Sequence, residues 1–97
     1  MDVIVRGRNV AVPDQLRASA RRKVSQVGRI APDVAWAEVD FSEERNPRIR
    51  DRHRCAVVVH RRRARVAAHA AAADPEGALE RALDKLRHQV VQRKDHR

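Results

Sequence analysis

The stretch RVAAHAAAADPE, residues 65–76, decides the fold of this 97-residue chain. Its alanines prefer a helix by intrinsic propensity. However, a helix that continued through Pro75 would lose a backbone hydrogen bond, at a cost of about 3 kcal/mol. Asp74 is a typical N-cap, Pro75 suits the first helical position, and Glu76 adds favourable negative charge to the first turn. We therefore predict a strand that starts at Arg65 and a separate helix over residues 75–94.

Alternation of side chains predicts two further strands before this one, over residues 35–42 and 52–61. In these three strands, the side chains expected on the buried face are Ala35, Ala37, Val39, Phe41, Cys55, Val57, Val59, Val66, Ala68, Ala70 and Ala72. The charged segment 42–51 is predicted as a loop. The RRRA sequence at 61–64 is predicted as a hairpin turn.

The N-terminal part adds one strand and one helix. Residues 2–6 (DVIVR) are predicted as a short strand. Residues 13–27 are predicted as a helix, with Pro13 in the first helical position and Gly28 as the C-terminal stop. Its buried face is expected to consist of Leu16, Ala20, Val24 and Val27.

This order predicts an α+β fold, β-α-β-β-β-α, formed by residues 1–97 as a single domain. The first two strands should be parallel and joined by a right-handed crossover, whereas the later strands form antiparallel hairpins. Both helices should then cover one face of a four-stranded sheet.

The charge of the chain points to a polyanionic partner. The formal net charge is +9, with 22 Lys and Arg against 13 Asp and Glu, and nucleic acid is the first candidate for such a surface. The sequence lacks an apolar run of membrane-spanning length and the apolar core of a signal peptide, so a cytoplasmic location without membrane contact is expected. The single cysteine, Cys55, is predicted to be a buried strand thiol.

Signatures of enzymes are absent. The sequence contains no P-loop, GxGxxG, HExxH or nucleophile-elbow motif. The five histidines are scattered without partners at ligand spacing. We therefore expect no enzymatic activity, no cofactor, no metal and no small-molecule substrate.

The two predicted helices carry the candidate binding residues. Helical spacing places Arg81, Lys85 and His88 about opposite the apolar side of the last helix, and Arg17 and Arg21 one turn apart on the first. Solvated helix faces are the ordinary explanation, but the net charge favours phosphate binding. The predicted RNA-binding residues are Arg17, Arg21, Arg22, Lys23, Arg81, Lys85, His88, Arg93 and Lys94. Because Trp36 and Phe41 are the only aromatic residues of the Phe, Trp and Tyr group, recognition through phosphate, ribose and shape is expected rather than base stacking.

Three segments resemble the ribosome hibernation promoting factors, also called ribosome-associated inhibitors or ribosomal subunit interface proteins. The first strand, turn and helix start of that family are similar to IVRGRNVAVPDQLR (4–17). The second strand and loop of its actinobacterial members are similar to VDFSEERN (39–46), and its terminal helix is similar to ALERALDKLRHQVVQRKDH (78–96). The chain departs from the family in having DPEG where an aromatic residue is common, and Gln92 where a basic residue is frequent.

The resemblance implies a domain like those that bind double-stranded RNA, which occupies the mRNA and tRNA decoding channel of the small ribosomal subunit. It places Arg17, Lys23, Lys85, His88 and Lys94 on basic positions of the family's helices. The sequence fits either a short member or an N-terminal domain, and dimerisation is not expected from this domain alone. Two alternatives stay open: a basic protein-interaction module that uses the surface around Trp36 and residues 45–52, and a generic binder of structured RNA.

Overall fold

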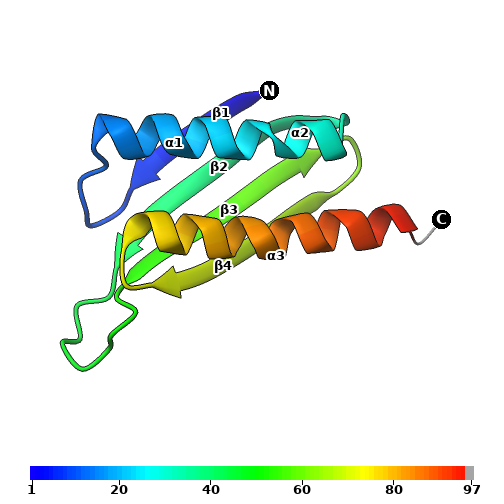
Figure 1. The fold of residues 1–97 in the computed structure, drawn as a ribbon. Helices are drawn as coiled ribbons and strands as arrows, with labels where there is room; N and C mark the ends of the chain where they lie inside the picture. The colour runs from blue at the N-terminus through cyan, green and yellow to red at the C-terminus, as the bar shows by residue number, and fades with distance from the viewer. Residues whose placement is uncertain (96–97) are drawn as a thin grey trace.

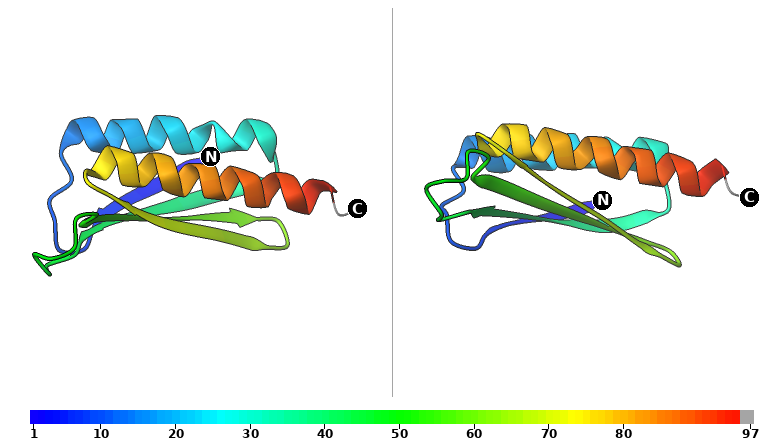
Figure 2. Two further views of the ribbon diagram at one scale, coloured as in Figure 1. Left: turned by 60° about the horizontal axis from the view of Figure 1, so that its bottom comes forward. Right: turned by 90° about the horizontal axis from the view of Figure 1, so that it is seen from below.

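The computed structural model describes residues 1–95, and their side chains as far as Val91. Its elements, in chain order, are β1 (Asp2–Gly7), α1 (Asp14–Ser25), α2 (Val27–Ile30), β2 (Val34–Glu43), β3 (His53–Arg61), β4 (Arg65–Ala72) and α3 (Pro75–Asp95) (Figure 1). The sheet order is β1-β2-β3-β4. β1 pairs with β2 in parallel, and the other two pairs are antiparallel. The helices cover one face of the sheet (Figure 2), so the predicted architecture is confirmed.

The boundary between β4 and α3 follows the local chemistry of residues 65–76. The side chains of Val66, Ala68, Ala70 and Ala72 are buried beneath the helices. Because these side chains are small, α3 can pack close to the sheet. The Asp74 carboxylate accepts a hydrogen bond of 2.6 Å from the backbone N–H of Gly77, which satisfies one of the donors left unpaired at the start of a helix. The prediction of a strand followed by a capped helix is confirmed.

Two predicted helix ends were wrong. Pro13 has an extended backbone (φ −60°, ψ 154°) and is the N-cap of α1 rather than its first helical residue. Gly28 does not stop the helix, because it lies inside α2 and has no left-handed backbone. Instead, the N–H of Gln26 bonds to the carbonyl of Lys23 at 3.2 Å. This tightened turn separates α1 from α2, which continues in nearly the same direction (Figure 1).

One predicted core position was also wrong, since Ala35 is exposed while Val34 is buried. The register between β2 and β3 shifts between Val34 and Trp36. Such an irregularity changes which side chains point inward. The strict alternation therefore begins at Ala37 and includes Val39 and Phe41, as predicted.

The core lies between the sheet and the helix layer. The largest fully buried side chains include Phe41 from the sheet and Leu79, Leu83 and Leu86 from α3. Cys55 is also buried there, which confirms its prediction as a strand thiol, and burial raises its pKa to about 12. The outer helix surfaces and the open sheet face remain for binding.

Candidate nucleic-acid interface

Arg17 connects α1 to an edge of the sheet. Its Nη1 donates a hydrogen bond of 2.6 Å to the backbone carbonyl of Val5 in β1. β1 is the first strand in the sheet order and has a neighbour on one side only. The guanidinium therefore satisfies a carbonyl that the sheet leaves unpaired, and the side chain is partly buried.

Side chains of α3 perform the same role on the opposite edge. Arg81 donates to the carbonyl of Ala71 at 2.7 Å, and Lys85 donates to the carbonyl of His69 at 3.1 Å. One turn further along, the amide of Gln89 donates to the carbonyl of Ala67 at 3.1 Å. These three carbonyls belong to β4, the other edge strand. Gln89 was not among the predicted residues, although its spacing of four residues from Lys85 was an available signal.

Arg81, Lys85 and His88 are all exposed on α3, as their predicted place opposite the apolar side requires. Arg81 and Lys85 do not point straight away from the core, because they reach sideways to the edge of β4. Arg17 reaches the edge of β1, so the basic rows of the two helices lie on opposite flanks of the domain. The Arg81 side chain remains 59% exposed, and a guanidinium has further N–H groups available for a partner.

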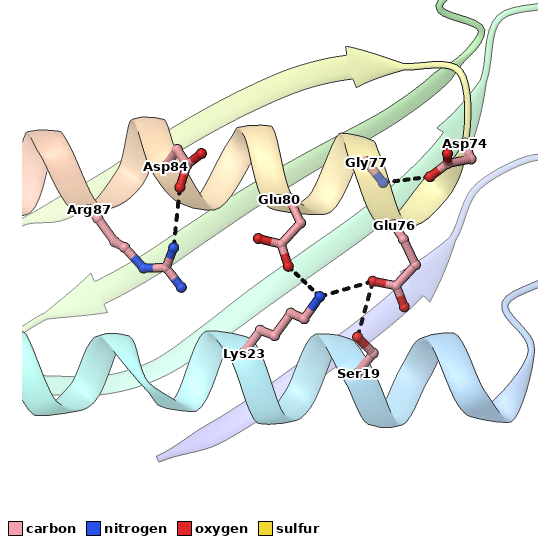
Figure 3. Close-up of polar contacts among 8 residues, drawn as sticks. All are labelled: Ser19, Lys23, Asp74, Glu76, Gly77, Glu80, Asp84 and Arg87. Carbon is pink, nitrogen blue, oxygen red and sulfur yellow. Dashed lines mark hydrogen bonds and ion pairs between the residues drawn. The ribbon is translucent and has the colours of Figure 1, made fainter.

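Lys23 has a different environment from the other candidates. Its ammonium group bonds to Glu80 and lies 3.3 Å from Glu76, both on α3 (Figure 3). The hydrogen bond to Glu80 raises the pKa of Lys23, and Glu76 adds to this effect. Ser19 of α1 donates to Glu76 at 3.1 Å. Lys23 thus joins the two helices, and its charge is already balanced by two carboxylates.

The remaining predicted residues differ in how far the structure describes them. Arg21 and Arg22 are exposed on α1 and form no ion pair with any residue of the described part of the chain. His88 is exposed on α3. Arg93 and Lys94 lie beyond the described side chains. RNA binding by all these residues stays a prediction.

The open face of the sheet carries an ordered polar cluster. The rings of Trp36 and His60 are stacked, with centroids 3.8 Å apart and planes 5° apart. The His60 ring also lies 2.8 Å from Glu38, which binds Arg6 on its other oxygen. These contacts, the one to His60 first, lower the pKa of Glu38. One face of the indole is thus covered by His60.

Among the described side chains, no three His, Cys, Asp or Glu residues form a group that could hold a metal ion. Within residues 1–95, no helix has both the length and the apolar character needed to cross a bilayer.

Comparisons with known proteins agree with this fold. The family model described as sigma 54 modulation protein / S30EA ribosomal protein matches residues 3–97. The ribosome hibernation promotion factor of Mycobacterium tuberculosis (strain ATCC 25618 / H37Rv) is 31% identical over 97 residues. That alignment covers 99% of this chain and 44% of the relative, so the chain spans less than half the length of that protein.

Two solved structures have the same architecture. The crystal structure of the Thermus thermophilus Protein Y N-terminal domain superposes with a TM-score of 0.78 at 25% identity, covering 93% of this chain and 96% of that domain. A ribosomal subunit interface protein from Coxiella burnetii superposes with a TM-score of 0.83 at 16% identity, covering 98% and 99% of the two chains. The second likeness, at its low identity, shows the fold alone.

Proposed function

Since this chain belongs to the sigma 54 modulation protein / S30EA ribosomal protein family, the family of hibernation factors that its motifs resemble, we propose that it binds idle ribosomes, inhibits translation and preserves them. Residues 1–97 act as one ribosome-binding domain in this proposal. The domain occupies the mRNA and tRNA decoding channel of the small subunit and contacts ribosomal RNA. Hibernation factors of this family are not enzymes, and no cofactor is required for such a role.

The observation that carries the proposal is the distribution of cations around the helix layer. Arg17 lies along the β1 flank, Arg81 and Lys85 lie along the β4 flank, and Arg21 and Arg22 are exposed on α1. A partner with one flat face would reach only one flank. A channel with RNA walls faces both flanks at once, so this distribution supports a channel as the binding site.

Arginine suits this site because its planar guanidinium can hold an acceptor with one edge and a phosphate with another. Arg81 uses Nη1 for the carbonyl of Ala71 and for a longer contact of 3.4 Å with Asp51, and it keeps other N–H groups. The contacts to the sheet edge also restrict the long side chain before binding, which reduces the entropy lost when RNA is bound.

The test is sedimentation of the purified protein with isolated small subunits over a salt series. Arg81→Gln with Lys85→Gln is the variant of choice, because an amide can still donate to the β4 carbonyls, as Gln89 does. If both cations contact phosphate, binding weakens and the slope of log affinity against log salt falls by about 1.4–1.8, that is, roughly 0.7–0.9 for each contact.

Gln89→Ala is the matched control. It removes one contact to the β4 edge without changing the charge, so binding should remain as in the wild type. An unchanged salt slope in the double variant would contradict a role of the α3 flank. Equally tight binding of the wild type to a simple RNA duplex would favour a generic binder of structured RNA over a ribosome-specific factor.

A further inference from the structure

The hairpin turn between β3 and β4 contains a second concentration of cations, away from the helix rows. Residues 61–65 read RRRAR, four arginines in five positions. The turn is closed by a hydrogen bond of 2.7 Å from the N–H of Arg61 to the carbonyl of Ala64. It lies at the end of the molecule where α2 ends and where α3 approaches its C-terminus (Figure 1).

Arg61 anchors this turn and is not available to a partner. Its side chain is 14% exposed and contacts Asp33 at both carboxylate oxygens, with Nε at 3.2 and 3.1 Å and Nη2 at 2.9 Å. This fork geometry is the strong form of an Arg–carboxylate pair. The hydrogen bond from Arg61, with a backbone contribution from Arg62, lowers the pKa of Asp33. Asp33 thus fixes both the first arginine and the backbone that follows it.

Arg62 and Arg63 have the opposite environment. Both are exposed, and their side chains form no ion pair with the residues that the structure describes. Together with Arg61 and the segment 30–33, they line a surface depression of about 440 Å³. Its one carboxylate, Asp33, is already paired with Arg61. Two uncompensated guanidinium groups therefore lie at the rim of a depression on a turn of fixed geometry.

We propose that Arg62 and Arg63 form a second RNA-contacting site, in which the anchored β3–β4 turn binds phosphates of the RNA backbone. This inference rests on the proposed function, because it assigns the turn to the same ribosomal partner. It extends the contact surface from the helix flanks to one end of the domain. Asp33 and Arg61 act as positioning residues, since they hold the turn without reaching the RNA.

The experiment is the same sedimentation assay with Arg62→Gln and Arg63→Gln combined. Loss of two phosphate contacts should weaken binding by about tenfold or more and lower the salt slope by about 1.4–1.8. The matched control is Arg45→Gln with Arg48→Gln, in the loop at the opposite end of the domain (Figure 1). Both arginines of that loop are exposed, so the two double variants differ in the place of the charge change and not in its size.

The outcomes separate the two proposals. Failure of the wild type to bind small subunits would contradict the proposed function itself. Normal binding by the Arg62/Arg63 variant, or an equal loss in both double variants, would overturn the turn site alone, since total charge would then explain the effect.

Asp33→Asn tests the positioning role, because a positioning effect and a net-charge effect would change the binding affinity in opposite directions. It removes a negative charge, so a purely electrostatic effect would strengthen binding. If the anchored geometry matters, binding weakens although the protein becomes more positive. Tighter binding of Asp33→Asn would refute the positioning role.

Discussion

Gly7 ends β1 at a point where the chain passes close to itself. A Cβ atom at this position would lie 2.2 Å from the carbonyl oxygen of Val10. The following residues are tied to β2, because the N–H of Arg8 bonds to the carbonyl of Phe41 at 2.9 Å. Asn9 pairs with the backbone N–H and carbonyl of Glu43, both at 2.9 Å. The neighbouring backbone therefore cannot move aside freely.

Gly7→Ala is expected to lower the free energy of unfolding by roughly 1–3 kcal/mol, the usual range for an atom forced into a packed site. Urea denaturation followed by circular dichroism measures this change. The Gly-Arg-Asn turn is one of the segments that resembled the family, and the close approach to Val10 is a physical reason for glycine there.

Gly28→Ala is the matched control for this substitution. A Cβ at Gly28 would meet only the Met1 side chain, at 3.5 Å, and the residue lies in α2. Alanine is favoured over glycine in a helix by about 0.5–1 kcal/mol, so this variant should be as stable as the wild type or slightly more so. Equal losses in both variants would contradict the close-approach explanation.

At the scale of the elements, α1 and α3 are joined by a polar contact as well as by the core. Lys23 lies between Glu76 and Glu80, and its side chain is 24% exposed (Figure 3). Because ion pairs near the surface contribute little, Lys23→Met should cost no more than about 1 kcal/mol at neutral pH. The measurement is urea denaturation of both proteins at a series of pH values.

The pH dependence of this difference has a definite sign. The glutamates raise the pKa of Lys23 in the folded protein above its ordinary value of 10.5. The stabilisation is therefore complete below 10.5 and is lost as the pH rises through the folded-state pKa. The stability of Lys23→Met should approach that of the wild type at strongly alkaline pH. A difference that stays constant through this range would show that the lost packing, and not the charge, is responsible.

At the scale of the whole molecule, paired carboxylates tie together segments that are distant in the sequence. Asp33 holds the β3–β4 turn through Arg61, and Glu38 joins β1 to β3 through Arg6 and His60. These partners lower the pKa of both carboxylates. Their stabilisation is present above the unfolded values of 3.8 and 4.5, and it is lost as the pH falls through the lower folded-state values.

Acid should therefore reduce the stability of the wild type more than that of Asp33→Asn. At neutral pH the variant should be less stable than the wild type. Below pH 3.8 the difference between their free energies of unfolding should become smaller. Urea denaturation of both proteins at acidic and neutral pH, followed by circular dichroism, measures this difference in stability. A difference in the free energy of unfolding that does not change with pH would contradict the role given to Asp33.

Local sequence determined most of the fold. The alternation in residues 52–61 and 65–72, and the Asp-Pro pair at 74–75, depend on near neighbours, so strands, helix start and strand order could be predicted. The misplaced features depended on partners elsewhere in the chain. Ala35 is exposed because the pairing of β2 with β3 shifts its register, which the sequence of one strand does not reveal.

The net charge and the candidate cations were likewise determined by the sequence alone, because charge is a property of composition and helical spacing follows from the backbone. What each cation contacts was decided only by the tertiary structure. Lys23 pairs with Glu76 and Glu80, 53 and 57 residues away, and Arg17 and Arg81 reach carbonyls on opposite edges of the sheet. The physical reason is that a nearby carboxylate neutralises a cation and a nearby carbonyl orients it. The packing of α1 and α3 on the sheet determines which of these groups lies within reach.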